Sequence, residues 1–165
     1  MARSSGKRLA TSQRKQWLQK LQPSDASENR GDKTSPNIVI DSNIWYSAIV
    51  YGRNPEKALD HCLENAVIQV SNTILDELMD KLQRKAAAPY RFRNQLRARL
   101  ESICEMVEIG EIPDAVRDPK DNHVVAAATR SQSNYIVTGD EDLVVLSPYE
   151  GIEIVKPADF LKLVK

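Results

Sequence analysis

Residues 37–43 read NIVIDSN, and the rest of the chain is organised around this stretch. Three apolar residues that favour β-structure, at positions 38–40, lead directly into Asp41, and an apolar, helix-compatible segment follows at 44–50. A continuous apolar run bounded by turn or cap residues predicts a buried parallel strand. Asp41 would then lie at the carboxyl edge of the sheet, where open α/β folds bind their ligands. A single aspartate there is weak evidence for chemistry, because it can also cap the following helix.

Further strands and helices alternate along the chain. Apolar runs at 67–70, 107–109, 135–138 and 152–155 predict strands, and residues 55–65, 73–85, 91–106 and 157–164 have helical patterns. Asp118 and Pro119 mark the start of one more helix, which places Asp121 at its third position. This alternation predicts a three-layer α/β/α sandwich with a mainly parallel central sheet.

The composition is that of one soluble globular domain. The chain has 165 residues, of which 41% are apolar, and it has no apolar run of the roughly 18 residues that a membrane span needs. Cys62 and Cys104 are isolated and lack metal-ligand spacing, which favours a reduced, cytoplasmic protein. Residues 1–36 are polar and basic and predict a flexible extension, in which residues 12–21 could form a short docking helix. Residues 37–165 are then the folded domain.

Basic residues are segregated although the net charge is zero. Residues 1–24 contain six Lys or Arg and no acid, and residues 81–99 contain seven and again no acid. Segregated positive charge indicates a polyanionic partner such as nucleic acid. A solvated helix face and a solubilising tail explain either cluster equally well.

Several acids are predicted to meet at one edge of the sheet. Asp41 and Asp140 both follow apolar strands, and these two acids converge if their strands are neighbours. Asp121 heads an apolar helix stripe just before the second strand, although a capping role would also explain it. Clustered carboxylates require raised pKa values or a cation, and oxygen ligands without His or Cys select Mg²⁺ or Mn²⁺. Such ions can activate water and stabilise charge on a phosphodiester.

Five motifs in order give the chain a family resemblance: VIDSN, ILDEL, DPKDNHVVAAA, YIVTGDEDL and GIEIVKPADFL. With these, residues 37–165 resemble the PIN domain, specifically bacterial PIN-domain proteins of toxin–antitoxin systems. The resemblance implies a PIN-type α/β sandwich and Mg²⁺- or Mn²⁺-dependent cleavage of RNA. It also implies that the catalytic and metal-binding acids are Asp41, Glu77, Asp121 and Asp140. ILDEL offers two adjacent acids; Glu77 is chosen because it directly precedes the Leu of the motif, and Asp76 is the alternative.

The resemblance also suggests supporting residues. Asn43 and Thr138 match polar positions that support the site, and Asp118 and Asp142 are candidates for auxiliary acids. For substrate binding, we expect arginines of the 81–99 segment to contact the RNA backbone, because the acids themselves repel a polyanion. The candidates are Arg91, Arg93 and Arg97.

The leading hypothesis is a cytoplasmic, metal-dependent endoribonuclease that acts as the toxin of a type II toxin–antitoxin system. Its expected partners are an RNA substrate and a cognate antitoxin protein, with a homodimer left open and no membrane. One alternative is a PIN-fold protein that binds nucleic acid or a partner without catalysis. Another is a structure-specific DNA nuclease, because the same metal chemistry cleaves either backbone.

Overall fold

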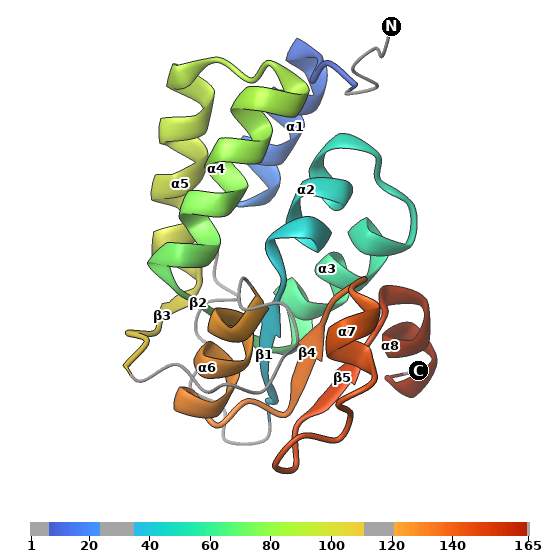
Figure 1. Ribbon diagram of the computed structural model, residues 1–165. Coiled ribbons are helices and arrows are strands. Elements are labelled where there is room, and N and C mark those ends of the chain that lie inside the picture. The colour runs from blue at the N-terminus through green and yellow to red at the C-terminus, as the bar shows by residue number, and fades with distance from the viewer. Residues whose placement is uncertain (1–6, 24–34, 111–120, 165) are drawn as a thin grey trace, which may run out of the picture.

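The computed structural model describes residues 7–23, 35–110 and 121–164. Within these segments the chain forms a five-stranded sheet in the order β3-β2-β1-β4-β5, and every neighbouring pair is parallel (Figure 1). The strands are β1 (Asn37–Ile40), β2 (Val67–Val70), β3 (Glu105–Met106), β4 (Tyr135–Val137) and β5 (Glu153–Val155). The predicted α/β architecture is confirmed, and β1 is the central strand.

Helices flank this sheet and extend beyond its carboxyl edge (Figure 1). Helix α6 packs on β1, β2 and β4, whereas α3 packs on β2 and on α8. The remaining long helices, α1, α2, α4 and α5, pack on one another. No helix in the described segments combines the length and apolar character needed to cross a membrane. The helices are α1 (Thr11–Lys20), α2 (Ser42–Val50), α3 (Arg53–Asn65), α4 (Asn72–Ala86), α5 (Tyr90–Ile103), α6 (Asn122–Arg130), α7 (Glu141–Val144) and α8 (Pro157–Leu163).

The central strand follows from its sequence. Ile38, Val39 and Ile40 are all buried, since helices or strands cover both faces of β1 and both of its edges. An all-parallel sheet requires strands that are apolar on both faces, as this one is. The chain leaves β1 at Asp41 and enters α2 at once. The geometry therefore fixes Asp41 at the centre of the carboxyl edge.

Helix α1 is part of the core. Leu9, Trp17 and Leu21 are each at most 2% exposed, and the Leu9 amide donates to the Ala86 carbonyl at 3.0 Å. The Lys20 ammonium binds the carboxylates of Glu56 at 2.7 Å and Asp60 at 2.9 Å, both on α3. The predicted helix is present, but residues 7–23 differ from the expected flexible extension because their apolar side chains are buried against the domain.

Several elements differ from the prediction. Helix α5 ends at Ile103 and not near 106, and the edge strand lies at 105–106 and not at 107–109. Both residues of β3 are exposed, and the strand is defined by the pairing of Glu105 with Gln69 and of Met106 with Val70. Helix α6 is described from Asn122, with Asp121 at its N-cap and not at its third position. The short helix α7 was not predicted.

Candidate functional site

Asp41 is held by a residue far away in the sequence. Asp41 is only 4% exposed, and its Oδ2 accepts a hydrogen bond from the Thr138 hydroxyl at 2.7 Å. Asp41 occupies the N-cap position of α2, yet its side chain makes no capping hydrogen bond. The capping explanation for this aspartate is therefore wrong. A buried carboxylate needs hydrogen bonds or nearby positive charge, and both are present here.

Thr138 connects Asp41 to Asp140. Its buried hydroxyl donates to Asp41 and accepts from the backbone N–H of Asp140 at 3.1 Å. Thr138 can link the Asp41 side chain to the Asp140 backbone because β1 and β4 are neighbours in the sheet. Asp140 also has a local role, since its Oδ1 accepts from the Asp142 amide at 2.9 Å and caps α7.

Glu77 projects from α4 toward α2 and α6. Its Oε1 accepts from the Ser42 hydroxyl at 3.0 Å, and its Oε2 lies 3.0 Å from Nε2 of His123. Partial burial by itself would raise the pKa of the Glu77 carboxyl. The contacts with His123, Ser42 and Lys81 outweigh burial, and the pKa lies below its ordinary value. Glu77 is therefore ionised at neutral pH.

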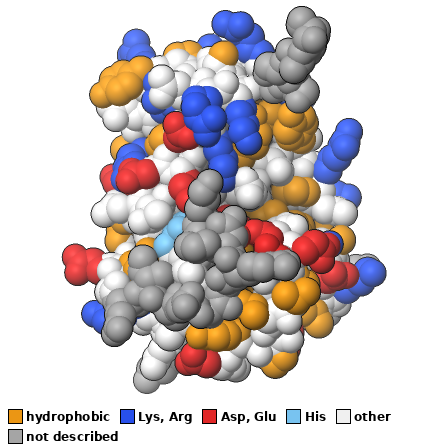
Figure 2. All heavy atoms as spheres, viewed as in Figure 1, with side chains coloured by type: hydrophobic (Ala, Val, Ile, Leu, Met, Phe, Trp, Pro, Cys, Tyr) orange, Lys and Arg blue, Asp and Glu red, His pale blue; other side chains and the backbone are white. Residues whose placement is uncertain are grey.

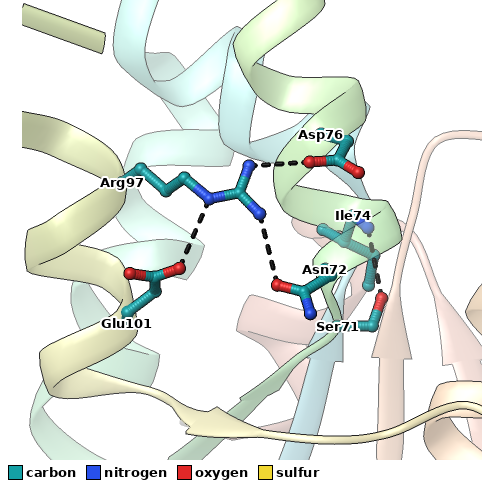
Figure 3. Close-up of polar contacts among 6 residues, drawn as sticks. All are labelled: Ser71, Asn72, Ile74, Asp76, Arg97 and Glu101. Atoms are coloured by element: carbon teal, nitrogen blue, oxygen red, sulfur yellow. Dashed lines mark hydrogen bonds and ion pairs between the residues drawn. The ribbon is translucent and has the colours of Figure 1, made fainter. Parts of the chain in front are cut away.

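The neighbouring acid of the ILDEL motif faces elsewhere. The Asp76 side chain is 70% exposed, and its carboxylate binds Arg97 of α5 at 2.7 Å. The same guanidinium contacts Glu101 at 3.3 Å and Asn72 at 3.2 Å, so it bridges α4 and α5 (Figure 3). Asp76 is thus occupied in a helix–helix contact away from the Glu77 network.

Lys81 lies one helical turn after Glu77 and turns its ammonium into the site. Its Nζ donates to the Ser42 hydroxyl at 2.6 Å. Burial lowers the pKa of Lys81, against the attraction of Asp41, Glu77 and Asp121, which raises it. The ammonium therefore lies within the electrostatic influence of these three acids. Figure 2 shows acidic side chains beside α7 and Lys and Arg side chains around α4 on the same face of the molecule.

Three residues of this network were missed in the sequence: Ser42, Lys81 and His123. Ser42 directly follows Asp41 and His123 lies two residues after Asp121, so proximity to the motif acids was the available signal. His123 is buried, and its Nδ1 has no hydrogen-bond partner among the described residues. Of the other predicted supporting residues, Asn43 is exposed in the first turn of α2 and Asp142 is half-buried near α7; Asp118 lies outside the described residues.

The site offers carboxylate and hydroxyl oxygens, which fit a hard divalent cation. Asp41, Glu77, Asp121 and Asp140 would hold it. In the described segments no group of three or more His, Cys, Asp or Glu side chains is already arranged as a metal cage. Both oxygens of Glu77 are instead engaged by protein groups, and the Lys81 ammonium supplies positive charge nearby.

The three arginines proposed for RNA contact have different environments. Arg97 is neutralised by its ion pairs with two acids. Arg93 donates to the Ala88 carbonyl at 3.1 Å, and its guanidinium lies 5.6 Å from the ring centroid of Tyr90. Arg91 is exposed, and within the described part of the chain it has no ion pair.

The fold is similar to that of two solved structures. One is the VapBC2 complex of Rickettsia felis bound to a DNA fragment from its promoter, with a TM-score of 0.50, 14% identity, and coverage of 72% of this chain and 96% of that one. The other is VapC20 of Mycobacterium tuberculosis, a toxin that cleaves the sarcin–ricin loop, with a TM-score of 0.50, 14% identity, and coverage of 70% and 98%. At this identity the likeness concerns the fold.

Comparison by sequence is more specific. A search of curated protein sequences gave no match. A family model for the PIN domain matches residues 37–142, which include Asp41, Glu77, Asp121 and Asp140. Because this match spans more than half of the chain, the protein belongs to the PIN-domain family.

Proposed function

We propose that this protein is a metal-dependent endoribonuclease that hydrolyses RNA phosphodiester bonds as the toxin of a type II toxin–antitoxin system. The observation that carries the proposal is Asp41, a buried carboxylate at the end of the central strand whose side chain binds Thr138 and does not cap its helix. Membership of the PIN-domain family and the likeness to toxin folds support a nuclease toxin. One of those toxins cleaves an RNA loop, which favours RNA as the substrate.

The proposed chemistry assigns a role to each element of the network. A bound Mg²⁺ or Mn²⁺ supplies Lewis acidity toward a phosphodiester and helps a water molecule to ionise. Asp41, Glu77, Asp121 and Asp140 would hold the ion, while Thr138 orients Asp41 and the pair Ser42 and His123 orients Glu77. Outer contacts of this kind fix the direction of metal ligands.

The proposed partners follow from the same comparisons. The resemblance to PIN-domain proteins of toxin–antitoxin systems supports a cognate antitoxin here, and one solved structure with a similar fold is VapBC2 bound to promoter DNA. A homodimer is left open, and RNA cleavage would take place in the cytoplasm. Purified protein should cleave labelled RNA with Mn²⁺ or Mg²⁺ and lose this activity in EDTA. Preferential cleavage of DNA would identify a DNA nuclease instead, and binding without cleavage in either metal would identify a binding protein.

The choice of Glu77 over Asp76 can be tested with a matched pair of variants. Glu77→Gln should reduce RNA cleavage about 10–100-fold or more, because it removes a charged ligand held by Ser42 and His123. Asp76→Asn should leave cleavage within about twofold of the parent, because Asp76 contacts only the exposed Arg97 bridge described above. Initial rates at saturating Mn²⁺ would decide the assignment, and a larger loss in Asp76→Asn would reverse it.

The basic segment is tested by the salt dependence of RNA affinity. Arg91→Gln combined with Arg93→Gln should weaken RNA binding and flatten the slope of log affinity against log salt by about 1.4, since each lost phosphate contact contributes roughly 0.7 for a single strand. Arg97→Gln should have a smaller effect, because two acids already neutralise this guanidinium. A double variant with unchanged affinity and slope would assign the segment to antitoxin docking or to solubility. Metal affinity should be unaffected in both arginine variants.

A further inference from the structure

Lys81 introduces a positive charge into a site built from acids. Its Nζ donates to Ser42 at 2.6 Å, and the same Ser42 hydroxyl donates to Glu77 at 3.0 Å. The Ser42 hydroxyl therefore links the Lys81 ammonium to the Glu77 carboxylate through two consecutive hydrogen bonds. Asp41 and Asp121 also interact electrostatically with Lys81, so the ammonium is directed toward the region where a divalent ion would be held.

The two neighbouring lysines of α4 differ in their exposure. Lys85 lies one turn further along α4 and is exposed, whereas Lys81 is half-buried. A lysine side chain is long and flexible enough to keep its ammonium in water, and burying it carries a desolvation cost. The acids and Ser42 offset part of that cost at position 81, although burial still leaves the pKa of Lys81 below its ordinary value. Lys81 thus behaves as a specific partner of the acid site.

We propose that the Lys81 ammonium is the resident counter-charge of the acid site and competes with the divalent cation for it. This inference rests on the proposed function, which requires the metal. The ammonium and the ion are both stabilised by the same carboxylates, and they repel each other. Metal binding must therefore move the lysine outward or take place beside its charge, and the chain binds Mg²⁺ and Mn²⁺ more weakly than its acids alone would.

The inference makes two predictions of opposite sign for Lys81→Met, which keeps the length of the side chain and removes the charge. Without metal, the variant should be less stable than the parent, because repulsion among the acids is no longer offset. With Mn²⁺, it should bind the ion about tenfold more tightly and gain more thermal stability, because only the native state binds. Thermal midpoints in EDTA and across a Mn²⁺ titration, with calorimetric affinities, measure both effects on the full chain.

Lys85→Met is the matched control, with the same substitution on the same helix at an exposed position. It should keep the Mn²⁺ affinity of the parent within about twofold. Lys81→Arg, which retains a positive charge, should also remain near the parent, and it serves together with Lys81→Gln if the methionine variant does not fold. Circular dichroism in EDTA checks the fold of each variant before titration.

The outcomes separate the inference from the proposed function. If the parent and Lys81→Met both fail to bind Mn²⁺ and Mg²⁺ at millimolar concentration, the metal-dependent function is wrong and the inference falls with it. If the parent binds metal and Lys81→Met binds it equally or more weakly, only the inference is overturned. Lower RNA affinity with unchanged metal affinity would likewise overturn it and would make Lys81 a phosphate contact. Tighter Mn²⁺ binding in Lys81→Met, absent from Lys85→Met, supports it.

Discussion

Replacing Asp41 with asparagine is expected to lower RNA cleavage in Mn²⁺ by at least about a hundredfold. Loss of a residue that only supports a metal ligand typically costs about 10–100-fold, and Asp41 is proposed as a ligand itself. The asparagine retains a carbonyl oxygen that can accept the Thr138 hydrogen bond, so the fold should persist. Single-turnover rates and circular dichroism on the same preparation measure the two parts of the expectation.

Two further variants bracket this result. Thr138→Val removes the hydroxyl that holds Asp41 and should give a smaller loss, in the range of about 10–100-fold. Asp80→Asn removes an exposed acid from α4, paired with Arg84, and should leave cleavage unchanged. If Asp41→Asn cleaved RNA as fast as the parent, the site would have been assigned to the wrong residues.

The Trp17→Ala variant should be the most destabilising of the substitutions considered. Trp17 is 2% exposed, in a helix that joins the core of the domain. Truncating a buried tryptophan to alanine costs about 3–5 kcal/mol, which for a chain of this size lowers the melting temperature by about 6–20 °C. The Lys20 ammonium, 4.5 Å from the Trp17 ring centroid, would also lose a contact.

Gln16→Ala provides the control on the same helix, because Gln16 is exposed. It should change the melting temperature by no more than a degree or two, since surface substitutions usually change stability by within about 0.5 kcal/mol. Equal melting temperatures for Trp17→Ala and the parent would mean that α1 does not dock in solution. The first 36 residues would then be the flexible extension that their composition suggests.

The sheet and the strand-end acids could be predicted from the sequence because both depend on local signals. Short apolar runs mark β1, β2 and β4, and Asp41 and Asp140 lie next to two of them. Parallel strands bring their carboxyl ends to one edge, so these two acids are expected at the same edge of the sheet. A supporting role for Thr138 was suggested by the motif in which it lies, and the structure shows that its hydroxyl donates a hydrogen bond to Asp41.

The helical part of the site could not be predicted from periodicity. Asp76 and Glu77 both lie off the apolar stripe of α4, and they differ only by the rotation of about 100° between successive helical residues. Only the packing of α4 beside α2 and α6 brings Glu77 to Ser42 and His123 and leaves Asp76 to Arg97. The direction of Lys81 has the same origin, because its partner Ser42 belongs to another helix.

The burial of α1 in the core of the domain could not be established from the local sequence pattern alone. Its sequence is mostly polar, and burial rests on a few large side chains that include Trp17. Composition predicts disorder for such a segment, whereas its contacts with α2 and α5 place it in the core. The edge strand β3 was misplaced for the opposite reason, because its two residues are exposed although they pair with β2.

The hydrogen bond between Thr138 and Asp41 joins residues 97 positions apart, and this separation bears on the order of events during synthesis. A ribosome adds about 5–20 residues per second, so Asp41 is made several seconds before Thr138. The contact between Glu77 and His123 spans 46 positions and is also completed late. A nascent chain that ends before β4 therefore carries Asp41 without Thr138, the residue that orients it. The same long-range topology that builds the site thus delays its assembly until translation of the domain is nearly complete.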